Sequence, residues 1–388
     1  IKMQIICSLS VKIMLRKNEG PNMRKLYNFA LYLIPQLLLS SSVAFSQDTK
    51  LLNIYNWSDY INPSVIDAFE KEYGIKVNYD IYDTSEIVDT KLLAGRSGYD
   101  VVFHGASFAS RLLAIGVFQS LDKSKLSNWG NLDPIKLEAI EEFDPGNRFG
   151  MPYMWGTTGV TYNADMIEAR LPNAPVDSYD LIFDPAVISK FSDCGVSFLD
   201  DPTSVVPMGM IYLGHPFNSV EPEHLEAVEE LFTAVRPYIK YFSSSKLTID
   251  LPSREVCIAM SWSGDYAVAI TRAREVGIDL NLKYAIPREG GIGWYDMAFI
   301  PADASHSDNA HLFLNYLLRP DVIATVTNYI GYANANQAAN PLIIPEYYSD
   351  VAIYPDDETF QSLEITHILE PTLERRRSRT WTRIKSGL

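Results

Sequence analysis

Segment 51–118 alternates short apolar runs with helix-like patterns, and this alternation restricts the possible folds more than any other feature of the sequence. Within it, Ile75, Val77, Tyr79 and Ile81 alternate strictly with polar residues, as a half-buried strand requires. A strand followed by a helix, three times in succession, predicts a parallel sheet covered by helices on both faces. We expect strands at 52–57, 75–81 and 101–103, and helices at 63–69, 85–93 and 107–115.

The pattern continues in the middle of the chain, with strands expected at 196–199 and 256–260 and helices at 222–235 and 265–276. A chain of 388 residues with this pattern fits two α/β lobes better than one enlarged sheet. Segment 151–163 and a segment near 284–294 are expected to cross between the lobes. The expected division is 47–155 with 284–330 for the first lobe, and 156–283 with 331–388 for the second.

The N-terminal segment reads as a targeting signal. Arg24 and Lys25 precede an apolar run that ends in small residues, and Ala44-Phe45-Ser46 fits a cleavage site. We therefore expect a signal peptide at 23–46, after an upstream extension at 1–22; an uncleaved membrane anchor is the alternative.

Export also bears on the cysteines, because two cysteines in an exported chain favour one disulfide. Cys194 and Cys257 are the two that remain after residue 46. The alternative is a pair of buried free thiols.

The net charge excludes some partners. The whole chain carries −15, and the part after residue 46 carries −20, because the first 46 residues hold six basic side chains and one acidic. An acidic surface repels nucleic acid and anionic membranes, so we expect neither as a partner. The negative electrostatic field of such a surface attracts a cationic solute.

Ligands of open α/β sheets bind beyond the carboxyl ends of the strands. Three segments at expected strand ends share one pattern, a tryptophan two or three residues before an aspartate. The three pairs are Trp57 with Asp59, Trp262 with Asp265, and Trp294 with Asp296. A fourth expected loop, 104–107, follows the third strand.

This pattern suits an alkyl chain with ammonium ends. Carboxylates accept charge-assisted hydrogen bonds from ammonium groups, and tryptophan faces attract cations and cover methylene groups. Each residue also has an ordinary explanation, since Asp59 or Asp265 could cap a helix and a single tryptophan could belong to a core. The recurrence of the pattern favours the ligand site.

Enzyme signatures do not occur in the sequence: there is no G-x-S-x-G, no H-E-x-x-H and no P-loop motif. We therefore expect no catalysis, no cofactor and no metal site. An enzyme acting on an amine, with Asp296 as the base, is one alternative. A receptor of the same fold for another cationic amine or small solute is a second.

Six stretches of the sequence resemble the polyamine-binding proteins of bacterial ABC importers: 54–61, 118–126, 151–155, 194–200, 332–336 and 381–387. The resemblance extends from about Leu51 to Gly387. It implies a type II periplasmic binding protein fold, in which two α/β lobes are joined by a hinge and the ligand lies in the cleft. It also implies a monomer in the periplasm, a polyamine ligand, and an inner-membrane ABC permease as the partner.

The resemblance also implies specific residues. It pairs Cys194 with Cys257, and seven positions keep the residue type of the family's ligand site: Trp57, Ser58, Asp59, Trp262, Asp265, Asp296 and Tyr332.

Three positions depart from the putrescine-binding pattern: Gly105 replaces a serine, Ser204 a carboxylate, and Trp294 a phenylalanine, as in spermidine-preferring relatives. Asp201 matches an acidic residue of spermidine binders. If Pro202 begins a helix, Asp201 and Ser204 share a face. The resemblance thus implies putrescine, spermidine or both, and the sequence does not choose between them.

Overall fold

The computed structural model describes residues 50–356, 359–360, 362–365, 367 and 369–387. The expected extension at 1–22 and signal peptide at 23–46 lie outside the described residues. Within the described part of the chain, no helix is both long and apolar enough to cross a membrane.

Within the described residues, eleven strands form one mixed sheet with the order β2-β1-β3-β9-β4-β7-β5-β6. Strands β8 and β10 pair with β4, and β11 pairs with β9. The expected parallel pairing is confirmed for β1 with β2 and β3, and β5 pairs in parallel with β6 and β7. It is wrong at the centre, where β9 runs antiparallel to β3 and β4. The strands are β1 (Leu51–Trp57), β2 (Lys76–Tyr82), β3 (Val101–Gly105), β4 (Gly150–Asn163), β5 (Val196–Phe198), β6 (Ile239–Phe242), β7 (Ile258–Trp262), β8 (Leu282–Ala285), β9 (Gly291–Phe299), β10 (Ala333–Asn334) and β11 (Leu363–Ile365).

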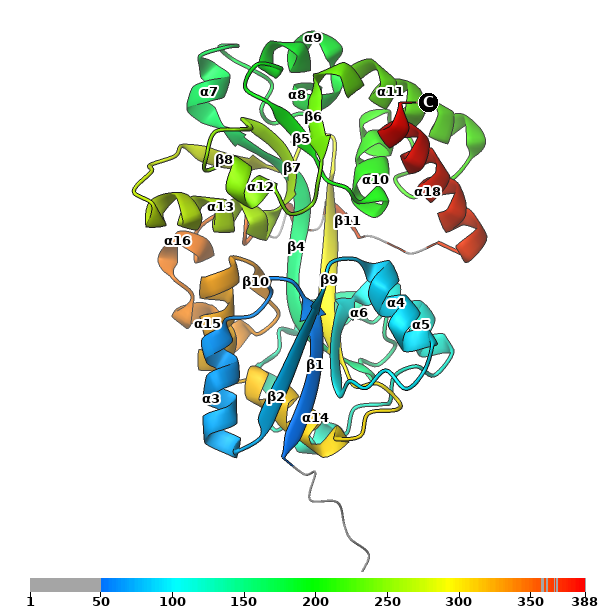
Figure 1. Ribbon diagram of the computed structural model, residues 1–388, viewed down its shortest axis with the longest axis vertical. Helices are drawn as coiled ribbons and strands as arrows, with labels where there is room; N and C mark the ends of the chain where they lie inside the picture. The colour runs from blue at the N-terminus through cyan, green and yellow to red at the C-terminus, as the bar shows by residue number, and fades with distance from the viewer. Residues whose placement is uncertain (1–49, 357–358, 361, 366, 368, 388) are drawn as a thin grey trace, which may run out of the picture. The chain divides into compact units, whose positions relative to one another are not determined.

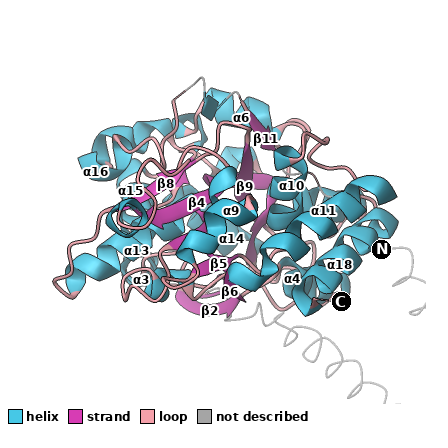
Figure 2. Cartoon of the chain, turned by 90° about the horizontal axis from the view of Figure 1, so that it is seen from above, coloured by secondary structure: helices cyan, strands magenta, loops and turns pink. Residues whose placement is uncertain are grey.

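Helices flank the strands on both sides (Figures 1 and 2). Helix α3 begins at Pro63, where the Asn62 side chain accepts a hydrogen bond from the Ser64 amide at 3.0 Å. The helices are α3 (Pro63–Tyr73), α4 (Ser85–Leu93), α5 (Ala106–Ala114), α6 (Pro134–Ile140), α7 (Ala164–Glu168), α8 (Asp180–Phe183), α9 (Pro185–Ile188), α10 (Pro202–Tyr212), α11 (Pro222–Val235), α12 (Leu247–Asp250), α13 (Ser263–Glu275), α14 (Ser307–Leu317), α15 (Pro320–Ile330), α16 (Pro345–Tyr348) and α18 (Pro371–Ser386).

The buried apolar side chains form two clusters, and β4 and β9 contribute to both. On β4, Met151 belongs to the first cluster and Val160 to the second; on β9, Ile292 belongs to the second and Met297 to the first. Each of these strands is therefore continuous through both clusters. They occupy the two segments where crossings between lobes were expected, although β9 runs beyond 294 to Phe299.

The C-terminal part of the chain is shared between the clusters. Tyr332, Ala333 and Tyr347 pack in the first cluster, whereas Trp381 packs in the second. The expected division, with 331–388 in the second lobe, stays a prediction. The pairing of β10 with β4 holds the segment after α15 against the first half of β4.

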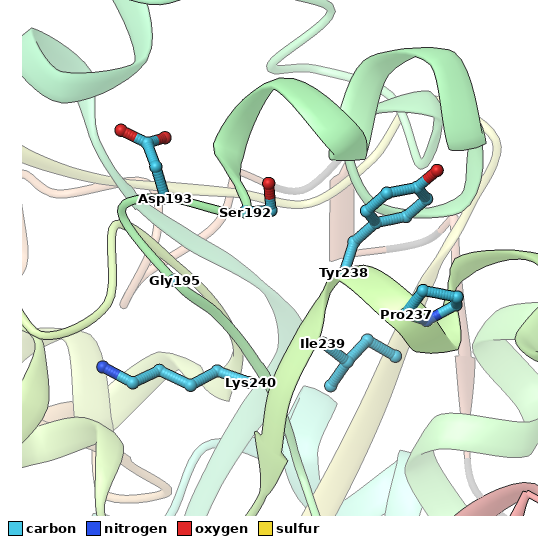
Figure 3. Close-up of a pocket in the computed structure, with 7 residues that line it drawn as sticks. All are labelled: Ser192, Asp193, Gly195, Pro237, Tyr238, Ile239 and Lys240. Atoms are coloured by element: carbon cyan, nitrogen blue, oxygen red, sulfur yellow. The ribbon is translucent and has the colours of Figure 1, made fainter.

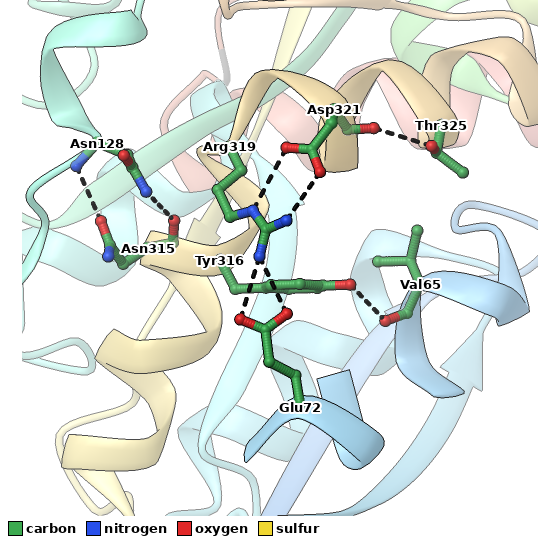
Figure 4. Close-up of polar contacts among 8 residues, drawn as sticks. All are labelled: Val65, Glu72, Asn128, Asn315, Tyr316, Arg319, Asp321 and Thr325. Atoms are coloured by element: carbon green, nitrogen blue, oxygen red, sulfur yellow. Dashed lines mark hydrogen bonds and ion pairs between the residues drawn. The ribbon is translucent and has the colours of Figure 1, made fainter. Parts of the chain in front are cut away.

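A polar network ties three helices of the first cluster together (Figure 4). The Arg319 guanidinium, between α14 and α15, donates to Glu72 on α3 at 3.0 and 3.2 Å and to Asp321 at 2.8 Å. The hydroxyl of Tyr316 donates to the backbone oxygen of Val65 at 3.1 Å. These contacts fix α3 against α14 and α15.

Cys194 and Cys257 form a disulfide, as predicted, with their Cα atoms 5.6 Å apart. Cys194 lies two residues before β5 and Cys257 directly before β7, and these two strands pair in the sheet.

We predict that a Cys194→Ala/Cys257→Ala double variant unfolds at lower urea concentration than the oxidised protein. The crosslink spans a sequence separation of 63 residues, for which the loss of chain entropy gives at most roughly 4 kcal/mol. Reductant should destabilise the native protein and leave the double variant unchanged. Equal urea midpoints for the oxidised protein and the double variant would contradict the prediction.

Candidate functional site

The central strand β4 places two of the candidate tryptophans on one face of the sheet. Gly156 of β4 pairs with Trp294 of β9, and Thr158 pairs with Trp262 of β7. Residues two apart on a strand face the same side. A Cβ atom at Gly156 would lie 2.7 Å from the Trp294 ring, so the indole packs over a position that only glycine can occupy.

Trp294 and Asp296 lie within β9, and the expectation that they belong to a loop is wrong. The two-residue spacing still favours a shared site, because residues two apart in a strand, here the tryptophan and the aspartate, lie on the same face. Likewise His104 and Gly105 belong to β3, and α5 follows at Ala106 with no intervening loop.

Asp296 sits where β9 meets β3, opposite Gly105. The Tyr60 hydroxyl donates to it at 2.8 Å. Burial raises the pKa of Asp296 to about 7, although the Tyr60 hydroxyl and the Trp57 indole N–H favour the ionised form. The Trp57 indole nitrogen makes no hydrogen bond of normal geometry to any residue that the structure describes.

Asp265 is the third residue of α13, and Trp262 rather than Asp265 occupies the capping position. The Tyr332 hydroxyl donates to one carboxyl oxygen at 3.3 Å, and the other oxygen accepts no hydrogen bond from the described residues. Burial raises the pKa of Asp265 to about 7, against the opposing effects of Tyr332, the Trp262 backbone and the more distant Arg272.

Aromatic rings connect the two carboxyl groups. The ring centroids of Tyr60 and Tyr332 are 5.3 Å apart, and those of Tyr332 and Trp294 are 5.4 Å apart. Asp296, Tyr60, Tyr332 and Asp265 therefore form one continuous set of contacts beside Trp294. We call these five residues the carboxyl–aromatic cluster.

Tyr60 was not predicted as a site residue. Its sequence signal is weak, since it directly follows Asp59 in a matched stretch but belongs to no tryptophan–aspartate pair. Burial, and then the Asp296 charge, raise the pKa of Tyr60 well above its usual value, so the hydroxyl remains a donor to Asp296.

Asp59 and Ser58 lie in the turn after β1. Asp59 caps no helix, because Asn62 caps α3; its φ of 55° places it in the left-handed region. Its side chain is 88% exposed and lies 3.6 Å from the Arg272 guanidinium. The Ser58 hydroxyl donates to Asp83 at 2.6 Å. Asp59 is thus paired with a cation of the chain itself.

Asp201 and Ser204 do share a face, because α10 begins at Pro202 as the expectation required. Asp201 caps the helix and accepts hydrogen bonds from the Thr203 amide at 3.0 Å, the Thr203 hydroxyl at 2.7 Å and the Ser204 hydroxyl at 2.6 Å. These contacts do not include the carboxyl–aromatic cluster.

A surface hollow lies beside the disulfide, and none of its lining residues is a candidate ligand residue (Figure 3). Its charged side chains already have partners: Lys240 donates to Glu255 at 2.8 Å, and Asp193 accepts from Arg170 at 2.8 Å. It is lined by Ser192, Asp193, Gly195, Pro237, Tyr238, Ile239 and Lys240.

Comparisons with known proteins identify related chains. Residues 64–355 match the family model described as bacterial extracellular solute-binding protein. The putrescine-binding periplasmic protein SpuD of Pseudomonas aeruginosa is 45% identical over 355 residues, covering 90% of this chain and 97% of that protein. The putrescine-binding periplasmic protein PotF of Escherichia coli is 45% identical over 358 residues, covering 92% and 97%.

A solved structure is also similar over most of the chain. The spermidine/putrescine ABC transporter substrate-binding protein PotD of Streptococcus pneumoniae superposes with a TM-score of 0.73 at 29% identity. The match covers 87% of this chain and 99% of that one.

We predict that Gly264→Ala disrupts the carboxyl–aromatic cluster. A Cβ atom at Gly264 would lie 2.2 Å from the Tyr332 ring, so the ring must move away from Asp265. The variant should melt at lower temperature than the native protein. Gly130→Ala is the control, because a Cβ atom there meets nothing within 4 Å. Equal melting temperatures for the two variants would contradict the assigned packing.

A second prediction concerns the stability of the ligand-free protein. Burial raises the pKa of Asp265 and of Asp296 to about 7 in the folded chain, above the 3.8 of an ordinary aspartate. Between these values the folded state binds more protons, so the free energy of unfolding should fall as pH rises from about 4 to 7, then level off. Urea unfolding at several pH values measures this dependence. An Asp265→Asn/Asp296→Asn variant should lose it; an equally steep dependence in that variant would refute the assignment.

Proposed function

Because the chain belongs to the bacterial extracellular solute-binding protein family, we propose that it is a periplasmic receptor that binds an alkyl polyamine and delivers it to an ABC permease of the inner membrane. The observation that carries the proposal is the carboxyl–aromatic cluster. It holds two carboxyl groups, Asp265 and Asp296, whose hydrogen-bond partners are tyrosine hydroxyls rather than cations.

Each of these carboxyl groups is suited to an ammonium group. An ammonium has three N–H donors, and Asp265 has a carboxyl oxygen that accepts none from the described residues. A cation placed there replaces the hydration that the carboxylate loses on burial and returns its pKa toward the ordinary range. The ammonium ends of the ligand would therefore supply the hydrogen-bond donors and the positive charge that the two buried carboxyl groups need.

The tryptophans are suited to the rest of such a ligand. Trp57, Trp262 and Trp294 are each partly buried against the apolar clusters. Their ring faces would cover methylene groups, and an ammonium over such a face gains about 0.5–2 kcal/mol. Trp262 packs against both clusters, which suits a ligand that contacts both lobes.

The chain has the type II solute-binding protein fold, as do its structural relatives. We assign the first cluster and residues 332–347 to one lobe and the second cluster with α18 to the other, and β4 and β9 to the hinge. A ligand that contacts both lobes stabilises the closed form. The receptor acts as a monomer.

No catalysis is assigned to the site. The relatives are named as binding proteins of transporters. If the protein were an amine-acting enzyme, Asp296 would be its base. In the structure Asp296 accepts a hydrogen bond from the Tyr60 hydroxyl, whose raised pKa keeps it protonated. This arrangement holds a carboxylate as an anchor.

We predict that Asp296→Asn weakens polyamine binding by roughly two to three powers of ten, because an ammonium end left without its carboxylate costs about 3–5 kcal/mol. Asparagine keeps the shape and can accept from Tyr60, so the ligand-free protein should remain folded. Calorimetric titration of refolded protein with putrescine and spermidine measures the affinity. Asp67→Asn, on the exposed face of α3, is the control and should bind normally.

The alternative role for Asp296 is structural. In that case Asp296→Asn would lower the melting temperature of the ligand-free protein and leave the affinity nearly intact. That outcome would remove Asp296 as an anchor.

A further inference from the structure

Two histidines near the loop between α10 and α11 lie stacked on each other, and the proposed function does not use them. The ring centroids of His215 and His224 are 4.0 Å apart, and the ring planes differ by 17°. We infer that this pair chelates a divalent transition-metal ion, with Zn²⁺ and Cu²⁺ as the best candidates. No metal site was expected from the sequence, because the two histidines are nine positions apart and match no metal motif. The inference is independent of the polyamine site.

The backbone that carries the two histidines is well ordered by hydrogen bonds. Gly214, which follows α10, has a left-handed φ of 73° and turns the chain. The His215 amide donates to the Met210 carbonyl at 2.9 Å. His224 lies in the first turn of α11. Both side chains thus begin from fixed backbone, which lowers the cost of holding them in a ligating arrangement.

His224 has the kind of partner that metal-binding histidines usually have. Its Nδ1 lies 2.7 Å from the Ser219 hydroxyl. A ligating imidazole commonly donates its second ring N–H to an oxygen, which fixes the ring and directs the other nitrogen toward the metal. Ser219 is itself held, because its hydroxyl accepts from the Glu221 amide at 3.3 Å and its amide donates to the Pro216 carbonyl at 2.9 Å. This arrangement leaves the Nε2 atom of His224 for a metal ion.

His215 supplies a second nitrogen. Its ring contacts His224 but makes no hydrogen bond to any residue that the structure describes, and the side chain is only half-buried. The four remaining histidines of the chain each have a carboxylate or a backbone amide beside a ring nitrogen: His104, His306, His311 and His367. The His215 imidazole is therefore accessible and uncommitted, as a metal ligand must be.

The distance between the rings suits chelation. Two imidazole nitrogens bound to a tetrahedral zinc ion at about 2.0–2.1 Å each lie roughly 3.3 Å apart. Nearly parallel rings at 4.0 Å reach that spacing with a small tilt of the side chains. Among the described residues no group of three His, Cys, Asp or Glu side chains could hold a metal ion. The site thus has two protein ligands, and water would complete the coordination.

The ligand type and the surrounding charge select the ion. Imidazole nitrogens suit Zn²⁺, Ni²⁺ and Cu²⁺, whereas Ca²⁺ and Mg²⁺ require oxygen ligands. Glu221 and Glu223 beside the pair are exposed, and segment 191–235 contains no lysine or arginine. Arg377 of α18 contacts the same loop at Asn218, 3.4 Å away, but its side chain is only 1% exposed. The surface at the pair therefore favours an approaching cation.

The test is calorimetric titration of the polyamine-free protein with Zn²⁺ at neutral pH, in a buffer that does not chelate metals. The native protein should bind one Zn²⁺ per chain at this pair. His215→Gln and His224→Gln should each weaken that binding at least about tenfold. Ser219→Ala, which removes the oxygen beside Nδ1, should weaken it by about tenfold. His367→Gln is the control and should bind normally, because His367 lies beside Glu142 and not in the stack.

Electron paramagnetic resonance of the Cu²⁺-loaded protein counts the ligands. The native spectrum should show coupling to two nitrogens, and each single variant should show coupling to one.

The alternative is that the two rings stack only as an aromatic pair. A native protein that binds no Zn²⁺, or unchanged affinity in both single variants, overturns the inference. Two Zn²⁺ per native chain and one per variant, at equal affinity, also overturn it, because the histidines then act separately. If His224→Gln disturbs α11, His215→Gln still decides the question, since its ring has no other partner among the described residues. None of these outcomes bears on polyamine binding, which is titrated separately.

Discussion

One strand, β4, determines how the rest of the molecule is arranged. Its 14 residues pair with β9 and β7 on its two sides and also with β8 and β10. Because it is continuous through both apolar clusters, the side chains that border its middle come from segments far apart in the sequence. Pairing with Gly156 and Thr158 places Trp294 and Trp262 on one face of the sheet, although these tryptophans come from different strands. The site is thus a consequence of how the two clusters are joined.

The same junction explains the electrostatics of the site. Carboxyl groups held at the meeting of two clusters lose hydration, and for Asp265 and Asp296 this effect is larger than the stabilising hydrogen bonds from tyrosines. Elsewhere, the candidate acid Asp59 lies beside a cation of the chain itself, Arg272. The cost of two unbalanced carboxylates is offset when a cationic ligand binds. The fold thus favours a positively charged ligand, because it buries two carboxyl groups beside tyrosine hydroxyls and not beside cations.

The sequence predicted local elements well and non-local ones poorly. Periodicity located β1 to β3 and the helices that follow them, because these depend on neighbouring residues. It missed the antiparallel centre of the sheet, because β9 inserts beside β3 from almost two hundred residues later. The tryptophan–aspartate pairs identified Asp265, Trp294 and Asp296 of the cluster, but placed 294–296 in a loop, and Tyr332 came only from the family resemblance. No local pattern could reveal that Tyr60 contacts Asp296.

The central claim is that two desolvated carboxyl groups receive the ammonium ends of the ligand. It is tested most directly by counting the protons released on binding, from calorimetric titrations in buffers with different ionisation enthalpies. With both pKa values at about 7, the account predicts release of close to two protons per ligand at about pH 6, falling to none above about pH 9. Binding at about pH 6 without proton release would contradict it.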